Sequence, residues 1–140
     1  MKLITVVCVL TVAQFAVAAD DDAEARKKLV GVWKGRVKQG ATGHEITFTL
    51  NLIKSRKDKK RDLGEGTFKL DLTKKPWRMD ATRTKGGRKG RVFLGIYALD
   101  GDTLQWCVRT SGTTRPTEFT TGNGNYCLIL KRQKEEEKIE

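Results

Sequence analysis

The sequence predicts an all-β protein, an antiparallel up-and-down barrel of roughly eight strands. Two observations support this fold. Short runs of alternating apolar and polar residues recur from Trp33 to Leu130, and turn residues separate these runs at near-regular spacing, with no long helical pattern between them. A meander of this length hides its two edge strands by closing on itself. A sandwich of two sheets is the alternative architecture.

The first elements are a short helical turn and a strand. The polar, alanine-containing segment 20–28 predicts one or two helical turns, and strand pattern begins at 29–33. Segment 44–53 has the clearest alternation, with apolar residues at every second position, and predicts one half-buried strand. Further strands are predicted at 68–72, 77–81, 92–99, 103–109, 116–121 and 126–130.

Two features refine the later strands. The segment 92–99 is apolar on both faces and predicts the most enclosed strand, while Gly95 within it indicates a bulge or a close backbone approach. Asp100-Gly101 is a tight-turn dipeptide that joins this strand to the next one. We therefore expect a hairpin across residues 92–109.

The N-terminus carries the pattern of a signal peptide at 1–19. A positive start at Met1-Lys2 precedes a mostly apolar run at 3–17, and residues 16–18 form an A-x-A cleavage pattern. The run is too short to be a good membrane span, so we expect none in the mature chain. The mature chain would comprise a lead-in at 20–30, a barrel domain at 31–133 and a charged tail at 134–140. We expect an exported protein, periplasmic or extracellular.

The chain is strongly basic. It has 28 Lys and Arg residues against 17 Asp and Glu residues, a formal net charge of +11, and most of the excess lies in clusters at 54–61 and 74–91. Such a field attracts polyanions, although a solvated surface loop explains the same clusters. Trp77 is the sole aromatic residue within them, which argues against nucleic-acid recognition by base stacking. The candidate partners are a small apolar ligand or a polyanionic surface, and no specific nucleic acid is expected.

Residues 31–33 resemble the Gly-x-Trp that opens the first strand of lipocalin-like barrels. In those barrels a basic residue on the last strand lies across the tryptophan. Arg132 ends the last predicted strand and is the candidate for this role opposite Trp33. A guanidinium stacked on the indole would close the floor of the barrel. The alternative is a Trp33 that is simply core and an Arg132 that is simply exposed.

The two cysteines that remain after signal removal test the strand count. An even pair, Cys107 and Cys127, suggests a disulfide in an exported protein, with both sulfurs outward if Trp106 and Leu128 face inward. If 116–121 is a strand between them, the cysteines lie about 9–10 Å apart, whereas a disulfide needs Cα atoms within about 7 Å. If that segment is a loop, the bond forms easily. The sequence leaves the pairing open.

Catalytic and metal-binding patterns are sparse. The single histidine, His44, has no second histidine or paired cysteine at a ligand spacing, so we expect a surface side chain and no metal site. Ser55 lies in a charge cluster and Ser111 in a Ser-Gly turn, and neither context suits a nucleophile. We therefore expect no catalysis and no cofactor.

The candidate ligand-binding residues are two interior aromatic side chains and one charged pair. Tyr97 and Trp106 are expected inside the barrel, where eight strands leave room for packed side chains or for one small ligand. Arg115 and Glu118 form either a salt bridge that fixes a loop at the barrel mouth or a pair that contacts a ligand. Whether the barrel is hollow stays open.

One set of sequence blocks carries a family resemblance that covers nearly the whole mature chain. The blocks are residues 29–33, 66–71, 74–76, 90, 94–97, 100–104, 107, 115–119 and 131–132. Together they resemble a family of uncharacterised small secreted domains known mainly from planctomycete bacteria. The resemblance implies a secreted, lipocalin-like binding or interaction module of unknown ligand, and it supplies no catalytic residues. The alternative function is an exported polyanion-binding or cell-surface protein that acts through its basic clusters.

Overall fold

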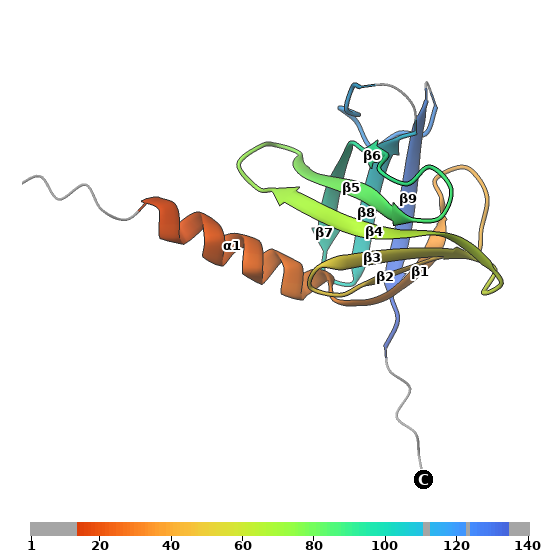
Figure 1. The fold of residues 1–140 in the computed structure, drawn as a ribbon, viewed down its shortest axis with the longest axis horizontal. Helices are drawn as coiled ribbons and strands as arrows, with labels where there is room; N and C mark the ends of the chain where they lie inside the picture. The colour runs from red at the N-terminus through yellow and green to blue at the C-terminus, as the bar shows by residue number, and fades with distance from the viewer. Residues whose placement is uncertain (1–13, 111–112, 123, 135–140) are drawn as a thin grey trace, which may run out of the picture.

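The computed structural model describes residues 14–110, 113–122 and 124–134, and shows an antiparallel barrel with one helix at its N-terminal side (Figure 1). The elements are α1 Gln14–Leu29, β1 Gly31–Val37, β2 His44–Phe48, β3 Leu52–Lys57, β4 Arg61–Asp71, β5 Trp77–Lys85, β6 Val92–Phe93, β7 Gly95–Asp100, β8 Thr103–Arg109 and β9 Asn125–Arg132. Neighbouring strands follow the order β4-β3-β2-β1-β9-β8-β7-β5-β6, and pairing of β4 with β5 closes the ring.

The barrel has eight strand positions, as the sequence predicts. Strands β6 and β7 share one position, because both pair with β5 on the same side, at Ala81–Phe93 and at Arg78–Ile96. The predicted strand at 92–99 is therefore interrupted at Leu94. Val92 at its start is 48% exposed, so this strand is less enclosed than its composition predicts.

Residues 44–57 form a hairpin, and the prediction of one strand at 44–53 is wrong. The Thr49 hydroxyl accepts a hydrogen bond from the Leu52 amide at 3.0 Å, which turns the chain between β2 and β3. Leu50 sits at this turn and is 49% exposed although it fits the alternation. The first basic cluster then forms a second hairpin, because Asp58 and Lys59 adopt left-handed conformations between β3 and β4.

The segment 116–121 is a loop, so the predicted strand there is wrong as well. Strands β8 and β9 pair directly and place Cys107 opposite Cys127, where the two sulfurs form a disulfide. The loop packs on the outer face of the barrel instead, with Pro116 buried and Phe119 against the disulfide. One strand lost here and one gained at β3 leave the strand count unchanged.

Helix α1 is longer than the predicted helical turn, and it projects from the barrel, which it contacts through its last residues (Figure 1). It has 16 residues, and its last residue, Leu29, is fully buried. The Arg26 guanidinium donates to the carbonyls of Leu50 and Phe68 at 2.9 Å each and lies 4.5 Å from the Phe68 ring centroid. Residues 1–13 of the predicted signal peptide and most of the predicted charged tail lie outside the described residues. In the described ranges, no helix has the length and hydropathy required to cross a membrane.

The predicted closure by Trp33 and Arg132 is confirmed. The Arg132 guanidinium lies 4.3 Å from the Trp33 ring centroid, and Trp33 is fully buried. Arg132 also donates to the Val30 carbonyl at 3.0 Å, to the Lys28 carbonyl and to the Asp102 carboxylate. These contacts fix the end of β9 to the junction of α1 and β1, so this end of the barrel is closed.

Candidate functional site

The end of the barrel away from α1 contains a cavity of about 310 Å³. Its walls are mostly apolar. The apolar side chains that line it are Ile46, Ile53, Leu63, Ala81, Phe93, Trp106, Val108 and Leu128. A volume of this size lies at the lower limit of small-molecule sites, and a barrel of eight strands has room for one small ligand. In this structure the barrel therefore has an open pocket at one end and a packed core at the other.

A hydrogen-bonded pair, His44 and Tyr126, adds polarity to one wall of the cavity. His44 opens β2 and Tyr126 lies near the start of β9, so the pair reaches across β1. The Tyr126 hydroxyl and His44 Nε2 share a hydrogen bond, and their ring centroids are 5.7 Å apart. His44 is 3% exposed, so the predicted surface histidine is instead a buried one. The pair offers a phenolic oxygen to a ligand in a mostly apolar cavity.

Burial controls the charge of both members of the pair. Desolvation lowers the pKa of His44 from its ordinary value of 6.5, and the nearby Lys57 ammonium lowers this pKa further, whereas Asp58 and the Ala41 carbonyl oppose the shift. Desolvation also raises the pKa of the Tyr126 hydroxyl above its ordinary value. Both side chains are therefore neutral near pH 7 and act as hydrogen-bonding groups without charge.

The state of His44 predicts a pH dependence of stability. Because its folded pKa lies below 6.5, the unfolded chain takes up a proton at a higher pH than the folded chain. The contribution of neutral His44 to the free energy of unfolding is fully present above its unfolded pKa and is lost as the pH falls towards its folded pKa. We expect urea unfolding at about pH 5.5 to give a lower free energy than at about pH 7.5, and His44→Gln to reduce this difference. Since His44 is the sole histidine, an equal loss in the variant would refute this assignment.

The opposite wall of the cavity has a basic rim. Arg83 on β5 donates to the Gly87 carbonyl at 2.8 Å and to the Leu63 carbonyl at 2.6 Å, which fixes its guanidinium between β4 and the loop that follows β5. Its Cζ atom lies 5.6 Å from the Phe93 ring centroid. Arg88, in the same loop, also lines the cavity. The rim is built by the second basic cluster, which the sequence did not connect with the cavity.

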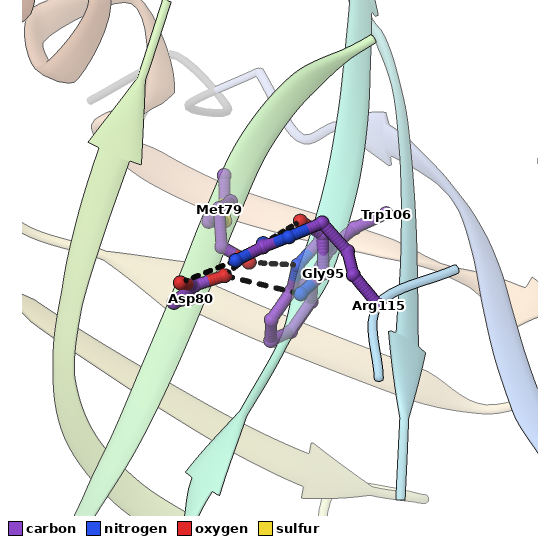
Figure 2. Close-up of polar contacts among 5 residues, drawn as sticks. All are labelled: Met79, Asp80, Gly95, Trp106 and Arg115. Carbon is purple, nitrogen blue, oxygen red and sulfur yellow. Dashed lines mark hydrogen bonds and ion pairs between the residues drawn. The ribbon is translucent and has the colours of Figure 1, made fainter. Parts of the chain in front are cut away.

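A polar network braces the wall at the break between β6 and β7, beside β5 (Figure 2). Inside the barrel, the Trp106 indole donates to the Met79 carbonyl at 3.2 Å. Outside it, Arg115 forms a two-pronged ion pair with the Asp80 carboxylate, which also accepts from the Gly95 amide at 3.2 Å. A Cβ atom on Gly95 would lie 2.6 Å from the Met79 carbonyl oxygen, so the predicted close approach is confirmed.

The predicted ligand residues are not brought together at one site. Trp106 lines the cavity, but Tyr97 does not: it packs on Trp77 with centroids 5.6 Å apart, and burial raises its pKa to about 12. The predicted pairing of Arg115 with Glu118 is wrong, because Arg115 contacts Asp80 on the outer wall and Glu118 is exposed.

Across the described parts of the chain, no group of three or more His, Cys, Asp or Glu side chains is placed to hold a metal ion.

Comparisons of the chain with protein-family models, with curated proteins and with solved structures found no match in any of the three. The resemblance of its sequence blocks to the planctomycete family therefore stays an expectation.

Proposed function

We propose that this protein is an exported, lipocalin-like binding module that holds one small, largely apolar molecule in the open end of its barrel. The observation that carries the proposal is the 310 Å³ cavity, which is walled mainly by aliphatic and aromatic side chains. Transfer of an apolar molecule from water to such a wall stabilises the complex by about 25 cal/mol per Å² of buried apolar surface. The function proposed is binding without catalysis.

Two further features support this proposal. The closed end fixed by Trp33 and Arg132 gives the barrel a rigid base, which lowers the entropic cost of ordering the walls around a ligand. The disulfide of Cys107 and Cys127 is typical of proteins that function in an oxidising compartment, and so supports export.

Polyanion binding by the basic clusters has weaker support. Several of the cluster charges are matched locally: the Glu65 carboxylate lies 3.6 Å from the ammonium groups of both Lys54 and Lys85, and Arg56 lies 3.9 Å from Glu45. Such pairing reduces the net field that a polyanion meets at the β3–β4 hairpin. Retention on heparin that persists at high salt would favour polyanion binding over the binding of a small apolar molecule.

The substitution Ala81→Phe tests the cavity directly. Ala81 on β5 is 7% exposed and lines the cavity, so a phenyl ring there would occupy ligand volume. We expect at least about a tenfold loss of affinity, equivalent to about 1.4 kcal/mol, for the neutral dye N-phenyl-1-naphthylamine, followed by its fluorescence, because the ring fills volume that the dye needs. The matched control is Ala98→Phe on β7, which does not line the cavity and should bind the dye as the parent does.

Two results would count against the proposal. Absence of dye binding to the parent protein would mean that the cavity does not accept apolar molecules. Equal losses in Ala81→Phe and Ala98→Phe would mean that the dye binds elsewhere or that any added ring disturbs the fold. Circular dichroism of both variants separates these last two cases.

A further inference from the structure

The geometry points to a narrower class of ligand: an amphiphile with an apolar body in the cavity and one anionic group at the rim, against Arg83 and Arg88. This inference rests on the proposed function and specifies its chemistry. It depends on three properties of the site, namely the fixed position of one arginine, the charge balance of the rim and the neutrality of the opposite wall.

The position of Arg83 is fixed before any ligand binds. Its guanidinium is held by the carbonyls of Leu63 and Gly87 and lies beside the Phe93 ring, on which the Arg91 guanidinium also lies at 5.3 Å. Carbonyl partners orient a guanidinium without neutralising it. A preorganised cation loses little entropy when an anion arrives, which makes it an effective anion-binding group.

The charge of the rim is left unbalanced. Glu65 is the one carboxylate among the residues that line the cavity, and it lies close to Lys54 and Lys85. Within the described residues, neither Arg83 nor Arg88 lies within 4.0 Å of a carboxylate. Arg88 is exposed at the loop tip and keeps its charge in contact with water. The rim therefore carries positive charge that an anionic ligand can balance.

The opposite wall fixes the orientation of the ligand. Strand β5 lies across the ring from β1, and the neutral His44–Tyr126 pair flanks β1. An anionic group placed against that pair would be desolvated against two neutral side chains, which is costly. Placed at the rim, the same group keeps part of its hydration and meets two guanidinium groups. The apolar body then points inward towards Trp106 and Leu128.

Two dyes with the same aromatic body test this inference. 8-Anilinonaphthalene-1-sulfonate differs from N-phenyl-1-naphthylamine by its sulfonate, so the ratio of their dissociation constants on the full chain isolates the anionic group. We expect Arg88→Gln to weaken sulfonate binding about threefold, and Arg83→Gln with Arg88→Gln about tenfold, while affinity for the neutral dye changes by less than about twofold. The control is Lys89→Gln, which removes the same charge from the neighbouring residue of the loop, outside the cavity lining.

Each outcome separates the inference from the proposed function. A smaller preference for the sulfonate in Arg88→Gln but not in Lys89→Gln supports the inference. If both dyes bind and the two variants behave alike, the rim has no specific role and the inference fails, although the binding function stands. Sulfonate binding that persists in Ala81→Phe would place the dye outside the cavity and also overturn the inference. If neither dye binds the parent, the proposed function itself fails.

Discussion

Replacement of Trp33 by Ala is expected to lower the free energy of unfolding by about 3–5 kcal/mol, the usual cost of deleting a buried tryptophan side chain. Trp33 is fully buried on β1, and its indole donates to the Leu29 carbonyl at 2.8 Å. The substitution removes the apolar contacts of the ring, leaves the Leu29 carbonyl without its donor and takes away the surface on which Arg132 stacks. Urea unfolding followed by circular dichroism measures the loss.

The substitution Arg132→Lys separates the effect of stacking on Trp33 from the effect of the positive charge. Arg132→Lys keeps the positive charge but loses the planar guanidinium and most of its hydrogen bonds to Lys28, Val30 and Asp102, so we expect it to be clearly less stable than the parent. A control is Arg36→Lys on β1, where the exposed side chain should tolerate the change. Parent-like stability of both Trp33→Ala and Arg132→Lys would mean that this end of the barrel is not what holds the fold closed.

The contact at the closed end was anticipated through a resemblance. A Gly-x-Trp at the first strand and an arginine at the end of the last one resemble lipocalin-like barrels, and the structure places Trp33 and Arg132 in contact. The fold class was predictable for another reason. Alternation and turn residues are local signals, and eight strands with short connections have few ways to bury one face.

Strand boundaries were less predictable, since local signals compete. The alternation of apolar and polar residues continues through Leu50. The Thr49 hydroxyl nevertheless accepts a hydrogen bond from the Leu52 amide, and the chain turns there. The segment 116–121 has strand-like composition, but Pro116 is buried and Phe119 is partly buried on the outer face of the barrel rather than in the sheet. Neither choice is visible without the surrounding structure.

The polar residues of the cavity were missed for a different reason, although Trp106 was predicted. His44 and Tyr126 are 82 residues apart, and their contact depends on β9 and β2 flanking β1. One available signal was that His44 shares the inward face of the alternation with Ile46 and Phe48. Arg83 likewise belongs to a basic cluster, and no local pattern separates an arginine fixed at a cavity rim from one free in solvent.

The disulfide between Cys107 and Cys127 gives the second large effect. Its sulfurs lie on the outer face of β8 and β9, as expected if Trp106 and Leu128 face inward, and both cysteines are fully buried. The bond spans a sequence separation of 20 residues, and closing a loop of this length stabilises the folded state by about 3 kcal/mol through the unfolded chain. We expect Cys107→Ala with Cys127→Ala to lose about this much, and reduction of the parent to have a similar effect.

The experiment compares urea unfolding of the oxidised parent, the reduced parent and the double variant. The reduced parent keeps both sulfurs for packing against Phe119. The difference in unfolding free energy between the reduced parent and the double variant therefore measures this packing. The difference between the oxidised and the reduced parent measures the cross-link. Alkylation before and after reduction counts the thiols, and two more must react after reduction if the bond is present. Equal labelling in both states, or an unfolding midpoint that reductant does not move, would show that the outer face of β8 and β9 is held by packing alone.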